Sequence, residues 1–494
     1  MSYSRLMMMM IMIMIMVMMM LMISNAYQRN FHSLSPLSLS SSSLSLSSRR
    51  LIKSKSLCMS SIVVEKKPQS LNSEGTSSMT ISSLNLMKNC VGAGVFSLNS
   101  RVTSISPNPS ILLPASGLIL LMATWATYNF YMIGETCTIT NSSSYGEAWG
   151  NTVSKQSQWI VQTIVVLAPI VSCLANTIVL TDILGLIFRS LGLPSAIYSN
   201  RNVVIAVLGS FILYPLCILK DLSALKSVSI VGIGGHLTAM AAFAVRLLDK
   251  SYTAGGQYYS GSILEKASLL PKLVAPIDPS KWFILAALLS YCFVAHYNAP
   301  RYYTELKDKD KDSYAFLKMA GTAYLGSASI YIGTIALAMS LFGKHSYSFA
   351  LNNFVARDPI GLIARVAFGT SVLASYPLIF LAMRNWFVQQ FTKIAPAIAE
   401  IKKVSAMLLL FICFLTTKVS DIGVVGSIAG GIFGSSMMFV FPPLMYIGAL
   451  KKQAKAQNKP LPMVKIILNI VLMVAGGSLG ITGTANTIKS ILKR

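Results

Sequence analysis

LNLMKNCVGAGVFSL, residues 84–98, combines a lysine and two glycines in a stretch that is otherwise mostly apolar. Gly92 and Gly94 weaken a helix, and Lys88 is costly to place in a lipid bilayer. A helix that breaks near the middle of a bilayer frees backbone amides and carbonyls, which can then hold a substrate. The stretch therefore predicts a secondary transporter whose binding site lies at this break.

The composition predicts an all-α polytopic membrane protein. Apolar residues make up 54% of the 494 residues, charged residues only 12%, and the mean hydropathy is +0.62. A scan for apolar stretches of roughly 20 residues finds about eleven of them. They lie near residues 84–104, 109–134, 158–187, 202–220, 224–247, 281–300, 316–342, 360–388, 404–418, 422–449 and 462–484.

The formal net charge of +25 is explained by membrane topology rather than by nucleic-acid binding. The basic residues are dispersed between apolar stretches, and no basic segment is interleaved with aromatic residues. If the amino-terminal tail is cytosolic, three of the most basic loops face the cytosol, namely Arg301 to Lys318, Arg384 to Lys403 and Lys451 to Lys465. The loop at 248–280 fits this rule less well, as long loops often do. We therefore expect the chain to meet a lipid bilayer and no nucleic acid.

The sequence contains no pattern of catalytic residues, so we expect neither an enzyme nor a cofactor. It shows no nucleophile paired with a base, no metal-ligand cluster and no phosphate-binding loop. The seven cysteines are scattered, which predicts packing thiols rather than a metal site or a disulfide framework. A channel is not expected either, because it needs a continuous polar pore rather than interrupted helices.

Two targeting segments are predicted before the first apolar stretch. Residues 1–26 carry a run of methionine and isoleucine after Arg5 and end in small residues before Tyr27, which predicts a signal peptide or a signal anchor. Residues 27–80 are rich in serine and arginine and predict a transit-like or disordered tail. In tandem, the two segments resemble the bipartite plastid presequence of algae with secondary plastids. That resemblance implies a plastid envelope or another endomembrane; a mispredicted start codon is the alternative.

Five stretches of the membrane domain predicted at 81–494 agree, in order, with one family. They are LMKNCVGAGVFSL (86–98), YGEAWGNTVSK (145–155), PLCILKDLSALKSVSIVGI (215–233), LSYCFVAHYNAPRYYTEL (289–306) and DPIGLIARVAFGTSVLASYPLIF (358–380). On these stretches the chain resembles the amino acid/auxin permease family, also called the transmembrane amino acid transporter family, and in particular its proton-coupled and vacuolar branches. The resemblance implies about eleven helices, of which the first ten form two inverted repeats of five as in the leucine-transporter fold. It also implies that substrate lies between a broken first and a broken sixth helix.

One departure from the family pattern follows the glycine pair. The family usually has a proline shortly after the pair, whereas the run here is SLNSRV, with Asn99 near that place. We therefore expect the outer half of the first helix to bend differently from that of other family members.

An amino acid presents a carboxylate and an ammonium, so its site must offer both donors and acceptors. The half-helix that begins near Gly94 would point its positive dipole end and unpaired amides at the carboxylate. Carbonyls around Cys90 and Val91 would accept from the ammonium. We therefore predict that Val91, Gly92, Ala93 and Gly94 form a backbone cradle; glycines that only permit close helix packing are the alternative.

The sixth apolar stretch is expected to supply the side-chain pocket. By resemblance, Tyr291, Cys292 and Phe293 would line this pocket. The polar run that follows ends in Pro300, which interrupts the helical hydrogen bonds. His296 is a possible proton relay, because imidazole titrates near neutral pH. A structural histidine bonded to a backbone carbonyl is the alternative that we favour.

Lys88 is the strongest candidate for a coupling residue. In sodium-coupled relatives of this fold, a metal ion lies between the first helix and hydroxyls of the eighth helix, and the matching hydroxyls here would be those of Thr370 and Ser371. The ammonium of Lys88 could occupy the position of that ion and take up and release a proton. The alternative is that Lys88 snorkels to the membrane interface as a topological anchor.

Two more polar residues lie within predicted spans. We expect Asp182, near the end of the third span, to be satisfied by Arg189 or solvent, and His236 to be a satisfied core residue.

These features together predict a proton-coupled carrier of small neutral amino acids that works by alternating access. A sodium-coupled carrier is one alternative. An amino-acid sensor that binds in the same pocket without net transport is another.

Overall fold

The structure is a computed structural model that describes residues 77–219, 228–253, 255–259, 278–306, 312–343, 346–394 and 399–492. The targeting segment expected at 1–26 and nearly all of the serine-rich tail expected at 27–80 lie outside the described residues. Both stay predictions.

The described residues form helices, with one isolated backbone pairing between Ser77 and Leu306. The longer helices are α2 (Met79–Cys90), α3 (Val95–Ile105), α4 (Leu112–Thr140), α6 (Gln158–Ser190), α10 (Val228–Leu248), α11 (Pro279–Phe293), α13 (Ser313–Phe342), α14 (Pro359–Ile394), α15 (Ile401–Lys418), α17 (Phe441–Ala456) and α18 (Met463–Leu492). Shorter elements are η2 (Pro109–Ile111), α5 (Tyr145–Thr152), α7 (Ser195–Tyr198), α8 (Arg201–Val207), η3 (Leu208–Leu213), α9 (Tyr214–Cys217), η5 (His296–Asn298), α12 (Ala299–Glu305), η8 (Ala350–Asn353), α16 (Ile422–Ala429), η10 (Gly430–Gly434) and η11 (Ser436–Val440).

Within the described residues, eight helices are long and apolar enough to cross a membrane. The other three predicted stretches fall on segments that are broken, short or more charged: α2 with α3, the run Arg201–Cys217, and α15. The all-helical architecture is therefore confirmed, while the total of about eleven crossings stays a prediction.

Both predicted interruptions are present. The first helix stops at Cys90, because Val91 leaves the helical region with φ −80° and ψ 78°, and helical structure resumes as α3 at Val95. The sixth stops at Phe293, where Val294 is extended with ψ 105°, and α12 begins only at Ala299, with Pro300 in its first turn. Proline fits the first turn because its missing amide would be unpaired there anyway.

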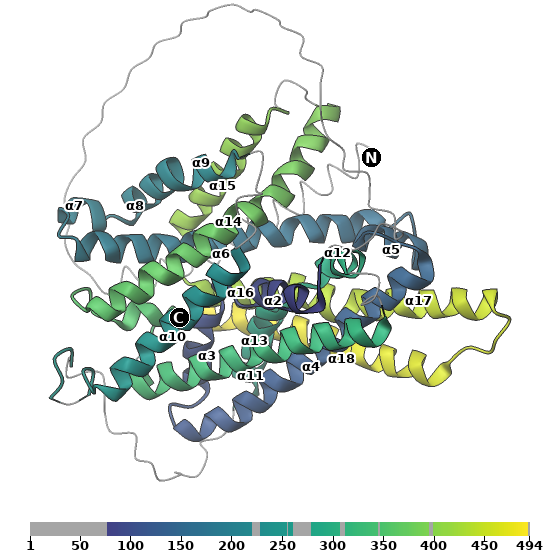
Figure 1. Cartoon of the computed structure of the whole chain (residues 1–494), viewed down its shortest axis with the longest axis horizontal. Coiled ribbons are helices and arrows are strands. Elements are labelled where there is room, and N and C mark those ends of the chain that lie inside the picture. Colours follow the sequence, from purple (N-terminus) through teal and green to yellow (C-terminus); the bar gives the residue numbers. More distant parts are fainter. Residues whose placement is uncertain are drawn as a thin grey trace, which may run out of the picture.

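The broken helices lie in the middle of the helical assembly (Figure 1). The unbroken helix α13 packs against α2, α3, α4 and α10, while α14 packs against both α10 and α6. α18 is largely exposed and packs against α11 and α17 at the periphery. One contiguous apolar core therefore surrounds the interruptions, with backbone groups of the breaks at its centre.

Two polar clusters hold the connection between α13 and α14. Asp182 accepts hydrogen bonds from Arg201 and from Asn352 of η8, rather than from Arg189 as the sequence suggested. Farther along, Arg246 at the end of α10 donates to the buried carboxylate of Asp358, just before α14. These bonds join segments that are distant in sequence, so charge pairing within one apolar stretch could not predict them.

Candidate functional site

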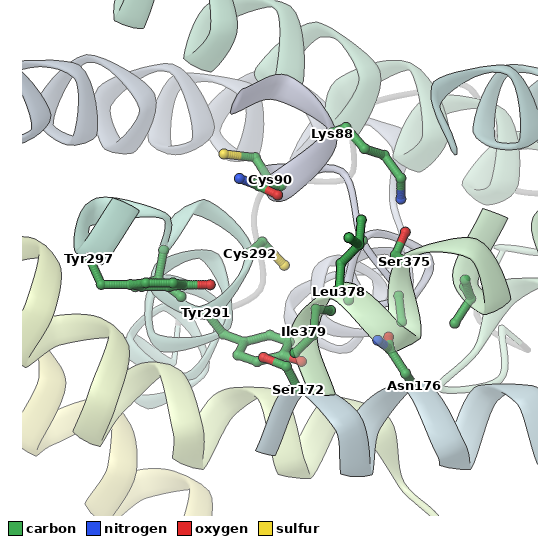
Figure 2. A pocket seen from close by; sticks show the side chains of 16 residues that line it. Lys88, Cys90, Ser172, Asn176, Tyr291, Cys292, Tyr297, Ser375, Leu378 and Ile379 are labelled. Atoms are coloured by element: carbon green, nitrogen blue, oxygen red, sulfur yellow. The ribbon is translucent and has the colours of Figure 1, made fainter. Parts of the chain in front are cut away.

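A cavity of about 140 Å³ lies between the two interruptions and the helices α6 and α14 (Figure 2). Its lining comprises Lys88, Asn89, Cys90, Gly92, Ala93, Gly94, Ser172, Asn176, Tyr291, Cys292, Val294, Tyr297, Val372, Ser375, Leu378 and Ile379. Four helices thus contribute to one enclosed site at the core of the protein. Among the residues that the structure describes, no aspartate or glutamate lines it.

The first interruption presents unpaired donors to this cavity. Among the described residues, the amides of Ala93 and Gly94 donate no hydrogen bond, whereas those of Gly92 and Val95 bond to Cys90 O and Gly92 O within the break. These free amides lie at the start of α3, where the helix dipole is positive. The arrangement suits a carboxylate.

The carbonyls of the same interruption are already engaged. Cys90 O accepts from the hydroxyl of Tyr331 at 2.7 Å, and Val91 O accepts from the ammonium of Lys88 at 3.5 Å. Gly92 O lies 3.2 Å from Nε2 of His236. Protein donors therefore already engage these carbonyls, from Lys88 in the same span and from the distant Tyr331 and His236. That carbonyls around Cys90 and Val91 also receive a substrate ammonium stays a prediction.

Polar side chains from α6 and α14 offer acceptors instead. Asn176 is 7% exposed and lines the cavity, yet neither of its amide atoms has a hydrogen-bond partner among the described residues. Ser172 lies one helical turn before it, and Ser375 faces the same cavity from α14 (Figure 2). Sequence reasoning missed all three. The available signal was the i, i+4 spacing of Ser172 and Asn176 within an otherwise apolar helix.

Lys88 lies inside the protein, with 8% of its surface exposed. Its side chain packs on Gly232 of α10, where an added Cβ atom would lie 1.8 Å from Cε of Lys88 and would displace the end of the lysine chain. Lys88 forms no ion pair with any residue that the structure describes. The ammonium therefore reaches into the wall of the cavity rather than toward an interface.

Of the two predicted hydroxyls on α14, only that of Ser371 lies near Lys88. Ser371 is fully buried and donates to Gly232 O at 2.9 Å, on the same glycine that Lys88 contacts. Thr370 is exposed and donates to Val366 O within its own helix, so the structure does not bring it to the site.

Three other predicted residues turn away from the cavity. The side chain of Val91 is fully buried in the apolar core, and the ring of Phe293 packs on Tyr331 with ring centroids 4.8 Å apart. His296 is fully buried, with Nε2 3.0 Å from Ala126 O on α4, which is the structural arrangement that we favoured. Gly92, Ala93, Gly94, Tyr291 and Cys292 do line the cavity, together with Lys88.

A second, wider cavity of about 540 Å³ adjoins the site through Tyr297, which lines both. Residues of α5, α6, α12 and α14 form the rest of its wall, including Arg301 and Trp386. Beyond the other end of the break, α3 is packed against other segments. Asn99 is fully buried and donates to Ser346, and Arg101 lies 3.7 Å from Asp421, the residue before α16. Tyr297 is therefore the residue that the two cavities share.

Two solved structures have a similar fold. The structure matches MhsT in complex with L-phenylalanine with a TM-score of 0.52 and 13% identity, over 84% of this chain and 100% of the other. It matches Mhp1 in an inward-facing conformation with a TM-score of 0.57 and 11% identity, over 85% and 90% of the two chains. The leucine-transporter-like fold, with broken first and sixth helices, is thereby confirmed.

Sequence comparisons give the family. The family model described as "Transmembrane amino acid transporter protein" matches residues 75–488. "Amino acid transporter AVT6B" of Arabidopsis thaliana is 20% identical, over 78% of this chain and 86% of its own length. "Vacuolar amino acid transporter 2" of Saccharomyces cerevisiae is 19% identical, over 83% and 84%. "Sodium-coupled neutral amino acid transporter 7" of Homo sapiens is 20% identical, over 81% and 85%.

The family match spans nearly all of the membrane domain, including both interruptions and the four spans that line the cavity. The family and the relatives are described as amino acid transporters. The chain therefore belongs to the transmembrane amino acid transporter family.

Proposed function

We propose that this chain is a proton-coupled secondary transporter of small neutral amino acids, working by alternating access across the membrane of a plastid envelope or another endomembrane. The observation that carries the proposal is the buried ammonium of Lys88 at Val91 O, beside the glycine whose carbonyl Ser371 binds. The ammonium of Lys88 lies between the first and eighth spans, where sodium-coupled relatives of this fold hold a metal ion. A positive charge at this position favours protons as the coupling ions.

The electrostatics around Lys88 support this choice. Burying an ammonium without a carboxylate partner costs free energy. Lys88 can therefore release its proton and become a neutral amine during a transport cycle. The titratable groups around it are His236 from α10, the cavity-lining thiols Cys90 and Cys292, and the phenols Tyr291 and Tyr297 from the sixth span. None of them supplies a negative charge to hold the proton permanently.

The substrate would lie across the cavity. Its carboxylate would accept from the amides of Ala93 and Gly94, and its ammonium would donate to Asn176, Ser172 or Ser375. The volume of about 140 Å³ is close to that of the engineered cavity of about 150 Å³ that holds benzene. A small side chain fits this space. A cationic side chain would find no carboxylate there.

Replacing Asn176 with leucine should weaken alanine binding about tenfold or more, because the substrate ammonium loses a buried acceptor and becomes partly unpaired. The matched control is Asn129→Leu: Asn129 is also buried and unpartnered among the described residues, but it lies in α4 outside the cavity. Equilibrium binding of radiolabelled alanine to both purified variants checks the prediction. Equal affinities in the two variants would remove Asn176 from the site.

Uptake into proteoliposomes tests the proposed function. Purified protein is reconstituted, and radiolabelled alanine uptake is measured under an imposed pH gradient without sodium, and under a sodium gradient at constant pH. We expect the pH gradient alone to drive accumulation. Sodium-driven uptake that ignores pH would instead match the name of the human relative and refute proton coupling. Binding of alanine without uptake under either gradient would favour a sensor.

A further inference from the structure

We propose that Tyr331 is a positioning residue that joins the two broken helices, so that α2 and α11 move as one unit with α13 during transport. The proposal rests on the proposed transport function, because it concerns how the same site changes its access. It starts from one phenol oxygen that contacts the ends of both helices.

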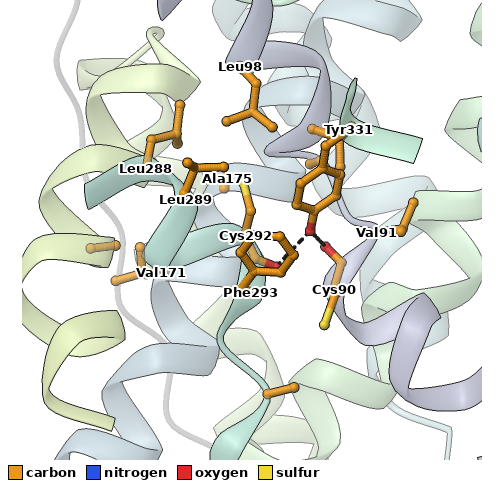
Figure 3. Packing of buried hydrophobic residues seen from close by; sticks show 14 of the residues in the cluster. Cys90, Val91, Leu98, Val171, Ala175, Leu288, Leu289, Cys292, Phe293 and Tyr331 are labelled. Carbon is orange, nitrogen blue, oxygen red and sulfur yellow. Dashed lines mark hydrogen bonds between the residues drawn. The ribbon is translucent and has the colours of Figure 1, made fainter. Parts of the chain in front are cut away.

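The hydroxyl of Tyr331 lies 2.7 Å from Cys90 O and 3.0 Å from Cys292 O (Figure 3). Cys90 is the last residue of α2, and Cys292 lies next to the last residue of α11. Carbonyls at the end of a helix lack their partner from the next turn, so each needs a donor from elsewhere. A single side chain supplies that donor to both interruptions.

A phenol has only one hydrogen to donate, so the two carbonyls share it. Tyr331 and Phe293 are fully buried, and Cys292 is 5% exposed, so the shared bond lies inside the core of the protein. If α2 and α11 moved apart, at least one of the carbonyls would lose this donor inside the core. The shared bond therefore favours conformations in which both helix ends stay together.

The helix that carries Tyr331 is a suitable support. α13 is an unbroken helix of 30 residues that packs against both halves of the first span, α2 and α3. The ring of Phe293 packs on the Tyr331 ring, which adds an apolar contact to the same joint. Tyr331 does not line the cavity. Its effect on transport would therefore come through the helices and not through contact with substrate.

The same helix offers a matched control. Tyr324 lies seven residues, or about two helical turns, before Tyr331 and is also fully buried, but its hydroxyl has no hydrogen-bond partner among the described residues. Tyr331→Phe and Tyr324→Phe remove the same atom from similar surroundings on α13. They differ in whether that atom joins the two interruptions.

The test compares these two variants with wild-type protein and with a variant that carries 4-aminophenylalanine at position 331. The aromatic amine has nearly the shape of tyrosine but two hydrogens, enough for both carbonyls. Equilibrium binding and uptake of radiolabelled alanine are measured in proteoliposomes. We expect Tyr331→Phe to lower the maximal uptake rate about tenfold or more, while alanine affinity changes much less. Tyr324→Phe should behave as wild type, and 4-aminophenylalanine should restore the rate.

A second readout does not depend on transport. Cys90 and Cys292 line the cavity beside the two carbonyls, so their reaction with a small methanethiosulfonate, located by mass spectrometry, reports how open the joint is. Tyr331→Phe should speed this labelling, and Tyr324→Phe should not.

The outcomes separate the two proposals. Absence of uptake by the wild-type protein refutes the proposed function, whereas unchanged labelling and an unchanged uptake rate in Tyr331→Phe refute the joint. A fall in affinity that matches the fall in rate would also overturn the positioning role. If Tyr331→Phe does not yield folded protein, the variant with 4-aminophenylalanine at position 331 is the test. If that protein folds but its uptake rate is below that of wild type, the proposal is contradicted.

Discussion

Replacing Lys88 with methionine should abolish the accumulation of alanine under a pH gradient. For one proton per substrate, a gradient of one pH unit can support about tenfold accumulation, and without the coupled proton the ratio should fall to about one. Methionine keeps most of the length and apolar volume of the lysine chain that packs on Gly232. Removing an unpaired buried charge should not destabilise the fold, because such a charge is itself costly. Uptake and counterflow in proteoliposomes measure the loss.

Counterflow of alanine should survive in Lys88→Met, since the amides of Ala93 and Gly94 and the polar groups of α6 are unchanged. Lys451→Met is the control: it removes the same charge from an exposed position on α17, and its uptake should equal that of wild type. Persistent pH-driven accumulation in Lys88→Met would show that another group carries the proton.

Replacing Asp358 with alanine should lower the free energy of unfolding by about 3 kcal/mol, because it leaves the buried Arg246 without its main partner. Asp358 is fully buried and accepts from Arg246 Nε and from the hydroxyl of Tyr252, 2.9 Å away. Asp249 still pairs with Arg246 in this variant, which limits the loss. Unfolding of the protein in detergent, with and without the substitution, measures the difference.

Glu305→Ala is the control for Asp358→Ala. It breaks the ion pair between Glu305 and Arg301. The side chain of Arg301 is 75% exposed and that of Glu305 is 33% exposed. A solvent-exposed pair of this kind should contribute no more than about 1 kcal/mol. Equal losses in the two variants would contradict the role assigned to the buried pair.

The contribution of Asp358 should also depend on pH. Burial raises the pKa of Asp358, but hydrogen bonds from Arg246 and Tyr252 outweigh it and hold the pKa below its ordinary value of 3.8. A carboxyl with a lowered folded-state pKa stabilises the protein above its unfolded pKa and loses that effect as the pH falls through the folded value. The difference between wild type and Asp358→Ala should therefore be full near neutral pH and shrink below about pH 4.

The position of the first interruption could be predicted because its cause is local: Gly92 and Gly94 weaken the helix. The sixth helix was expected to break at the run that ends in Pro300, but it stops at Phe293, and Pro300 lies in the first turn of α12. The direction in which each side chain near a break points could not be predicted from neighbouring residues. Successive residues of a helix point about 100° apart, so Cys292 faces the cavity while Phe293 turns to the core. The rotation of α14 likewise separates Ser371 from Thr370.

The residues of α6 illustrate a second limit. Ser172 and Asn176 lie in α6, whose composition is that of any apolar span. They line the cavity only because α6 is one of the helices that pack around the break. Which of several apolar helices packs against a given face depends on ridge and groove contacts along its whole length. No local property of Asn176 contains that information.

By itself, the sequence determined that the chain spans a membrane and where its first helix breaks, because hydropathy and glycine act over a few neighbouring residues. The resemblance of five stretches in order indicated the family. The tertiary structure decided which side chains form hydrogen bonds with the backbone carbonyls of the first break. Tyr331 reaches Cys90 O across 241 positions of the chain, and His236 reaches Gly92 O across 144. A freed carbonyl takes the nearest donor in space, and only the packing of whole helices places that donor.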